Sequence, residues 1–277
     1  MPRPSAAPLP PADLRRVAVA ALVAEAGVFA RVRPAHKLQL VDALKRHFET
    51  NRILLRLGTE IETIQPEMKA DGTLGVAVGL DGKQHVFDAL LYCAGRKGNS
   101  DKLNLAAAGL EANDRGIITV DENYRTTVPH IYAAGDIIGF PALASTSMQQ
   151  GRHAACHAFG VPYQTQSDLM PYGIYSIPEI SMVGRNEDDL TKHGVPYAVG
   201  IARYREIARG QIIGDEIGML KLLFHNKTRQ LLGVHAIGDG ATELIHIGQT
   251  VMAFQGQIDY FIDAVFNYPT LAECYRV

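Results

Sequence analysis

The residues best placed to do chemistry stand where a short apolar run ends in Gly135 and Asp136. Small residues let a backbone approach a ligand closely, and a carboxylate at the end of a strand can accept a hydrogen bond from a sugar hydroxyl. A helix that begins near Leu143, Ala144 and Ser145 would point unpaired N–H groups, and the positive end of its dipole, at a negative group. The same residues also fit an ordinary strand, turn and capped helix, so the pattern alone leaves both interpretations open.

A second group of chemically able side chains is His153, Cys156 and His157. Histidines four residues apart face the same side of a helix, which is one way of holding a metal ion. No fourth ligand is evident in the sequence, and we therefore predict no metal site.

Changes of hydrophobic period divide the chain into the elements that must position these residues. Apolar residues at intervals of three and four predict an amphipathic helix over residues 36–49. The strands predicted after it, with Asp81 and Gly82 as a hairpin turn, cover residues 53–57, 60–64, 74–80, 85–87 and 88–94. A further strand pair is predicted at 117–120 and 130–134, before a helix with hydroxyl caps at 143–159.

The C-terminal third is rich in strands separated by two helices. The predicted strands cover residues 173–177, 197–204, 218–224 and 231–236, and the helices lie near 186–193 and 241–254. This order predicts an α+β domain with an antiparallel sheet.

The composition of the 277 residues is typical of a globular protein, with 47% hydrophobic and 20% charged residues and a formal net charge of −2. That balance gives no indication of nucleic acid or an anionic membrane as a partner. No apolar run is long enough to span a bilayer, the N-terminus makes a poor signal peptide, and the three cysteines form no CxxC pair. We therefore predict a cytoplasmic protein with free thiols.

Residues 126–136, TTVPHIYAAGD, resemble the second FAD-binding motif of the flavoprotein disulfide reductase superfamily. In that superfamily the aspartate binds the ribityl chain of the flavin, and the following helix points its N-terminus at the flavin pyrimidine ring. The resemblance implies that Asp136 binds the ribityl chain. It also implies that Leu143, Ala144 and Ser145 form the helix N-terminus that points at the flavin pyrimidine ring.

Residues 94–99, AGRKGN, resemble the G-R-x-P-N turn of the same superfamily, with Gly98 where proline usually stands. That turn lies near the bound nicotinamide nucleotide. The resemblance therefore implies that Ala94, Gly95 and Arg96 line an NAD(P) site.

The C-terminal third is similar to the dimerisation domain of the soluble pyridine nucleotide transhydrogenases, a family of this superfamily. The matching segments are GIYSIPEI at 173–180, HAIG at 235–238, ELIHIGQ at 243–249 and FNYPTLAE at 266–273. The similarity to this family as a whole runs from about residue 46 to the end of the chain. It implies a homodimer formed through residues 172–277.

The resemblance implies an α/β plus α+β fold, in which partial NAD(P)- and FAD-binding Rossmann-like domains precede an α+β dimerisation domain. Residues 28–44 instead resemble a short segment of P-type ATPase cytoplasmic domains, from which we infer no function. The predicted divisions are an unrelated or disordered segment at 1–45, a pyridine-nucleotide-binding remnant at 46–115, the C-terminal part of an FAD-binding domain at 116–165, and the dimerisation domain at 166–277.

Tyr268 separates the sequence from close relatives of the family. Dihydrolipoyl dehydrogenases and glutathione reductases carry H-P-T-x-x-E near the C-terminus, where the histidine takes a proton from the substrate thiol and the glutamate orients it across the dimer interface. Here Tyr268 replaces the histidine and Glu273 keeps the place of the glutamate. Because tyrosine phenols ionise near pH 10, they are poor bases at neutral pH. Thiol chemistry is therefore disfavoured, and the catalytic candidates are Tyr268 and Glu273.

No G-x-G-x-x-G segment is present in the chain, although the family uses two such loops for FAD and NAD(P). We expect half of each nucleotide site to be missing. The function implied is that of an FAD-dependent oxidoreductase, a Si-specific NAD(P)+ transhydrogenase moving hydride between NADPH and NAD, with the chain inactive alone. The alternatives are a dihydrolipoyl dehydrogenase-like disulfide reductase and a non-catalytic remnant that only dimerises.

Overall fold

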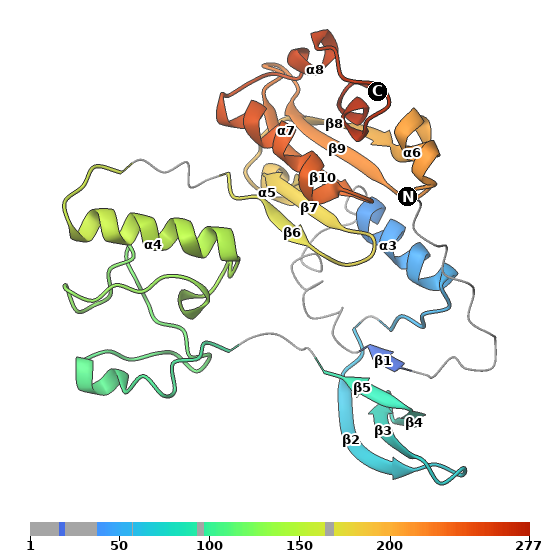
Figure 1. Cartoon of the computed structure of the whole chain (residues 1–277), viewed down its shortest axis with the longest axis vertical. Coiled ribbons are helices and arrows are strands. Elements are labelled where there is room, and N and C mark those ends of the chain that lie inside the picture. Colours follow the sequence, from blue (N-terminus) through green and yellow to red (C-terminus); the bar gives the residue numbers. More distant parts are fainter. Residues whose placement is uncertain (1–16, 20–37, 57, 93–96, 164–168) are drawn as a thin grey trace, which may run out of the picture. The chain divides into compact units, whose positions relative to one another are not determined.

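The computed structural model describes residues 17–19, 38–56, 58–92, 97–163 and 169–277 (Figure 1). The chain divides into two compact units. The first consists of Met1–Arg31 and Ile53–Gly95, and the second of Val32–Arg52 and Arg96–Val277. Of residues 1–45, only 17–19 and 38–45 are described, so residues 28–37 of the segment similar to P-type ATPases lie outside the described residues.

The first unit contains two small sheets. An antiparallel sheet has the order β2-β3-β4, and its strands are β2 (Ile61–Met68), β3 (Leu74–Leu80) and β4 (Lys83–Phe87). The hairpin predicted at Asp81 and Gly82 is confirmed, because both residues have positive φ (51° and 69°), as a tight two-residue turn requires. In the second sheet, β1 (Val17–Val19) pairs in parallel with β5 (Ala89–Leu91).

Two strand predictions in this unit are wrong or only partly right. Residues 53–56 form no strand, and Leu54 is 79% exposed. The strand predicted at 88–94 is short: β5 ends at Leu91, which is 56% exposed, and residues 93 and 94 lie outside the described part of the chain. An apolar run forms a doubly buried strand only where neighbours cover both of its faces, and the described residues provide no such cover.

The second unit begins with α3 (Leu38–Thr50), which confirms the helix predicted at 36–49. The segment at 97–163 has little regular structure. It contains η1 (Leu105–Ala108), η2 (Asp136–Ile138) and α4 (Ala144–Ala158).

The strands predicted at 117–120 and 130–134 are absent, although the helix predicted after them is confirmed. Only an isolated bridge joins Arg125 to Tyr132. A strand needs a neighbour along its whole length to pair its N–H and C=O groups, and the described residues place none there. Isolated bonds remain, such as Ile118 N–H to Ile137 O at 3.0 Å.

The C-terminal domain is an antiparallel five-stranded sheet in the order β6-β7-β10-β9-β8. Its strands are β6 (Tyr172–Ile174), β7 (Ile180–Gly184), β8 (Tyr197–Arg203), β9 (Met219–His225) and β10 (Leu231–Ile237). Its helices are α5 (Glu187–Lys192), α6 (Ala208–Ile213), α7 (Ala241–Ala253) and α8 (Asp259–Asp263). The predicted α+β domain is confirmed; β7 and the short helices α6 and α8 were not predicted.

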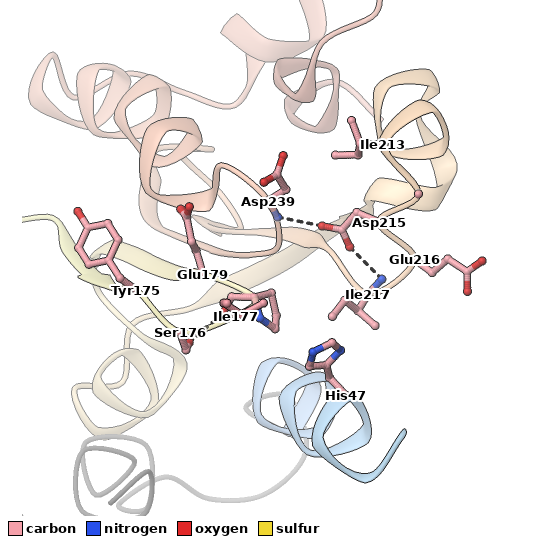
Figure 2. Close-up of a pocket in the computed structure, with 12 residues that line it drawn as sticks. His47, Tyr175, Ser176, Ile177, Glu179, Ile213, Asp215, Glu216, Ile217 and Asp239 are labelled. Carbon is pink, nitrogen blue, oxygen red and sulfur yellow. Dashed lines mark hydrogen bonds between the residues drawn. The ribbon is translucent and has the colours of Figure 1, made fainter. Parts of the chain in front are cut away.

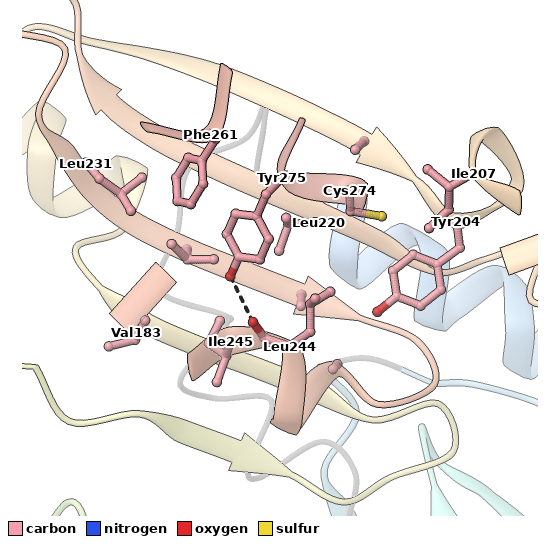
Figure 3. Packing of buried hydrophobic residues seen from close by; sticks show 14 residues of the cluster. Val183, Tyr204, Ile207, Leu220, Leu231, Leu244, Ile245, Phe261, Cys274 and Tyr275 are labelled. Atoms are coloured by element: carbon pink, nitrogen blue, oxygen red, sulfur yellow. Dashed lines mark hydrogen bonds between the residues drawn. The ribbon is translucent and has the colours of Figure 1, made fainter. Parts of the chain in front are cut away.

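The core of this domain lies between the sheet and α7 (Figure 3). Because side chains alternate along a strand, Val234 and Ala236 of β10 point to the same face, and both are fully buried. The C-terminal turn η4 (Leu271–Tyr275) closes the core. The Tyr275 hydroxyl donates to Leu244 O at 2.9 Å and accepts from Gly248 N–H at 3.0 Å, both in α7.

No helix within the described residues is long and apolar enough to cross a membrane.

Candidate functional site

The centre of the candidate site is the turn at Gly135 and Asp136. Gly135 is buried and has φ 86° and ψ −156°, a backbone conformation that a side chain would strain. A Cβ atom added there would stand 3.2 Å from Ser147 Oγ of α4. The backbone N–H of Gly135 donates to Gln150 Oε1 at 2.8 Å. The absence of a side chain therefore lets this turn lie directly against the helix.

Asp136 is the next residue and the first of η2, and its side chain is exposed. The short helix is followed by Gly139, whose N–H donates to Asp136 O at 3.1 Å. The carboxylate therefore lies at the surface beside a turn whose backbone is fixed. This is the arrangement expected of a group that accepts hydrogen bonds from a ligand.

Helix α4 starts at the far end of the loop that follows. Leu143 is its N-cap residue, in an extended conformation and without a side-chain cap hydrogen bond, so the hydroxyl caps predicted from the sequence are wrong. The Ser147 hydroxyl instead donates to Leu143 O at 2.8 Å. Ala144 and Ser145 are exposed. The first N–H groups of a helix have no partner within the helix, so this end presents donors and the positive end of the dipole.

The structure joins two parts of the predicted site. Gln150 and Ser147 belong to α4 and both approach Gly135, so the turn that carries Asp136 packs on the helix that begins at Ala144. Sequence reasoning missed both of these supporting residues. A polar residue on the buried face of a helix was the signal that could have found Gln150.

The nucleotide-binding turn predicted at Ala94, Gly95 and Arg96 lies outside the described residues. Its continuation is described. Gly98 N–H donates to Arg115 O at 2.7 Å, and a Cβ at Gly98 would stand 2.1 Å from Gly116 O. Proline has no N–H, so this bond could not form with the residue that usually stands here in the family.

Tyr268 and Glu273 lie on the C-terminal segment. Tyr268 is 75% exposed. Glu273 Oε2 accepts the N–H of Thr270 at 3.1 Å, which caps its own turn. Within the described residues no hydrogen bond joins Tyr268 to Glu273, and their catalytic roles stay predictions.

The two histidines of α4 contact tyrosine side chains. His153 packs against the rings of Tyr124 and Tyr163, with centroids 5.3 and 5.2 Å away. His157 Nδ1 is 2.8 Å from the Tyr132 hydroxyl. Among the described residues no group of three or more ligating side chains could hold a metal ion.

A separate cavity of about 740 Å³ lies in the second unit (Figure 2). His47 of α3 lines it, together with the loops at residues 175–179 and 213–217. Two of the carboxylates that line it bind neighbouring groups of the chain. Asp215 accepts the N–H groups of Ile217 and Asp239 at 3.1 and 2.9 Å. The Thr242 hydroxyl donates to Glu179 at 2.6 Å. These bonds shape the loops and indicate no ligand.

Comparison with known proteins gives two family matches. Residues 15–151 match the family described as pyridine nucleotide-disulphide oxidoreductase. Residues 170–276 match the pyridine nucleotide-disulphide oxidoreductase dimerisation domain.

Curated relatives carry the name soluble pyridine nucleotide transhydrogenase. The chain is 52% identical over 239 residues to the one from Mycobacterium tuberculosis (strain ATCC 25177 / H37Ra), covering 86% of the chain and 50% of the relative. It is 48% identical over 243 residues to the one from Marinobacter nauticus, covering 86% of the chain and 51% of the relative. The chain thus spans about half the length of the curated relatives it matches.

Solved structures give the same result for the fold. The HOCl-induced flavoprotein disulfide reductase RclA from Escherichia coli is similar with a TM-score of 0.77 and 26% identity, over 84% of this chain and 53% of that one. LpdA from Mycobacterium tuberculosis has a TM-score of 0.77 and 23% identity, over 87% of this chain and 52% of that one. The sequence resemblance is therefore confirmed, and the chain belongs to the pyridine nucleotide-disulphide oxidoreductase family, with soluble pyridine nucleotide transhydrogenases among its relatives.

Proposed function

We propose that the chain supplies part of an FAD-dependent oxidoreductase of the transhydrogenase type, which moves hydride between NADPH and NAD. One observation carries the proposal: the Gly135–Asp136 turn packs on α4 within a chain that is 52% identical to a transhydrogenase. A cytoplasmic location and the Si-specific reaction type are parts of the same proposal.

The residues of the turn and of the helix start fit a flavin. Gly135 lets the turn lie against α4, and Asp136 offers an exposed carboxylate. The first N–H groups of α4 have no partner within the helix and receive no side-chain cap from Leu143. Asp136 would accept a hydrogen bond from a ribityl hydroxyl. The start of α4 at Leu143, Ala144 and Ser145 would stabilise negative charge at the edge of the ring.

When bound, the flavin supplies the two-electron chemistry that passes hydride from one nicotinamide to the other. The protein has to orient the reactants and exclude side reactions. Ala94, Gly95 and Arg96 would line the nicotinamide nucleotide. This reaction needs no thiol base, so Tyr268 in place of a histidine is compatible with it.

We include a homodimer through residues 172–277 in the proposal. The matched family model is that of a dimerisation domain, and several of its apolar side chains are open to solvent in the single chain. They include Tyr175 (80%), Ile177 (85%), Val265 (89%) and Tyr268 (75%). A set of large exposed apolar side chains is typical of an interaction surface.

A chimera tests the activity. Residues 46–277 would replace the matching half of the Mycobacterium tuberculosis relative, and NADPH would be assayed with the thionicotinamide analogue of NAD. We expect the chimera to be yellow and to have transhydrogenase activity. The chain alone should have no such activity, because it lacks the two glycine-rich loops.

One alternative is favoured by a specific observation. The E. coli structure of similar fold is a flavoprotein disulfide reductase, so the chain could derive from an enzyme of that type. Tyr268 opposes this alternative. A chimera that holds flavin, reduces lipoamide and does not transfer hydride between nucleotides would establish the alternative and contradict the proposal. A chimera that holds no flavin and only dimerises would leave the non-catalytic alternative.

A further inference from the structure

We propose that Gln150 is a positioning residue of the flavin site, because its buried carboxamide holds the Gly135–Asp136 turn against α4. The inference rests on the proposed function, since it assigns Gln150 a role in presenting Asp136 to the flavin. Gln150 itself would touch the turn and not the ligand.

The burial of Gln150 is the first observation. Its side chain is only 5% exposed, and it shares the buried face of α4 with Thr146 (6%) and Ala154 (7%). A buried carboxamide is costly unless its polar atoms have partners. The Oε1 atom accepts the N–H of Gly135 at 2.8 Å, across 15 residues of sequence. The bond therefore satisfies two buried polar groups at once.

The second observation is the close approach of the turn to the same face of the helix. Ser147 lies three residues before Gln150, so the two side chains are neighbours on α4. A Cβ at Gly135 would stand 3.2 Å from Ser147 Oγ and 3.4 Å from Ser147 Cβ. Gly135 is therefore fixed by a hydrogen bond on one side and by close packing on the other.

The consequence concerns Asp136. It follows Gly135 directly, so the orientation of the Gly135 peptide sets the direction in which Asp136 leaves the turn. The start of α4, the other proposed flavin contact, is on the same helix as Gln150. The hydrogen bond thus fixes the two proposed contacts relative to each other, which is what preorganisation of a binding site requires.

Three variants separate this role from ordinary packing. Gln150→Leu removes the acceptor and keeps the approximate size, whereas Gln150→Glu keeps an acceptor oxygen. Gln149→Leu is the matched control: it makes the same change one position earlier, on a different face of the helix. If Gln150→Leu fails to fold, Gln150→Asn takes its place, because the shorter side chain withdraws the oxygen from Gly135.

Amide hydrogen exchange of Gly135 in the chain itself is the first measurement, and it needs no ligand. We expect roughly tenfold faster exchange in Gln150→Leu, because a hydrogen bond to a buried N–H is lost. Exchange in Gln150→Glu and in Gln149→Leu should stay close to that of the wild type. Unchanged exchange in Gln150→Leu would overturn the inference and leave the proposed function intact.

Riboflavin is the second probe, because it carries the ring and the ribityl chain without phosphate. We expect its dissociation constant to rise about tenfold in Gln150→Leu and to stay unchanged in Gln149→Leu. Faster Gly135 exchange with unchanged riboflavin affinity would reduce Gln150 to a structural residue and overturn the positioning role. If the wild-type chain binds no riboflavin while the exchange result holds, the flavin assignment itself fails, and the positioning role fails with it.

Discussion

Lys221 of β9 and Glu187 of α5 form an ion pair, with Nζ and Oε2 2.9 Å apart, and their side chains are only 4% and 6% exposed. Because side chains alternate along a strand, Lys221 points to the face of the sheet opposite to that of Leu220, which belongs to the core under α7. Glu187 Oε1 has no hydrogen-bond partner within the described residues. Among the described residues, the Glu187 carboxylate therefore depends on its bond to Lys221.

Removing one partner of this pair should be costly. Lys221→Met leaves the Glu187 carboxylate buried without its cation, and we expect the free energy of unfolding to fall by about 3 to 5 kcal/mol. The double variant with Glu187→Leu should recover most of the loss. Urea unfolding measures both. Lys97→Met is the control, because the Lys97–Asp101 pair is exposed and contributes at most about 1 kcal/mol. An equal effect of the two lysine substitutions would contradict the prediction.

A matched pair of glycine substitutions tests the close packing of the turn on α4. Gly135→Ala introduces a Cβ at a positive φ and beside Ser147, and should destabilise the protein by about 1 to 3 kcal/mol. Gly151 lies within α4 with nothing near the position of a Cβ. Gly151→Ala should therefore stabilise by about 0.5 to 1 kcal/mol. Thermal unfolding of both variants should shift in opposite directions, and a shift in the same direction would count against this geometry.

Alkaline pH should destabilise the C-terminal domain. Burial, with a smaller contribution from the charge of Glu273, raises the pKa of the Cys274 thiol from 9.0 to about 12. The unfolded chain ionises first, so the stabilising contribution is present below pH 9 and is lost as the pH rises toward 12. Between these values the free energy of unfolding should fall by up to about 1.4 kcal/mol per pH unit. Burial also raises the pKa values of Tyr204 and Tyr275, which adds to the effect at higher pH.

Urea unfolding between pH 8 and pH 10 measures this slope. Cys274→Ala should flatten it in that range, whereas Cys156→Ala on α4 should leave it unchanged. A wild-type slope in Cys274→Ala would show that another group is responsible.

The proposed homodimer depends on apolar side chains that are open in the single chain. Val265→Asp places a charge at a position that is 89% exposed, so the folded single chain should lose less than about 0.5 kcal/mol. The dimer dissociation constant should rise at least tenfold, as measured by sedimentation velocity. Phe159→Asp is the control, because Phe159 is similarly exposed (84%) but lies outside residues 172–277. A wild-type monomer, or a dimer insensitive to Val265→Asp, would contradict this interface.

The sequence predicted the C-terminal domain well because its strands find their partners within the same domain. Residues 231–236, for example, lie in β10, and β7 and β9 pair with it on both sides. The same signal misled at 117–120 and 130–134, where the apolar pattern is present but no pairing strand is described. An apolar pattern indicates which side chains are suited to burial, but it does not indicate whether a pairing strand is present.

The site was predicted only in part, for a related reason. Asp136 and the start of α4 were predicted from a motif. Gln150 and Ser147 contact Gly135 through tertiary packing, which no sequence motif describes. The wrong prediction of a hydroxyl cap has the same origin, because Ser147 lies one turn inside α4 and bonds to Leu143 O. Supporting contacts of this kind depend on tertiary packing, which a sequence pattern does not specify.

The most direct test of the flavin assignment is a competition titration on the chain itself. This half of the site should contact the ring and the ribityl chain, so FAD and riboflavin should bind with similar affinity. The fluorescence of both flavins should be quenched on binding, and ADP should not displace them. Asp136→Ala should weaken both at least tenfold, because a hydrogen bond to a charged group is lost, and the control Asp263→Ala should not. Absence of flavin binding, equal binding by Asp136→Ala, or displacement by ADP would contradict the account.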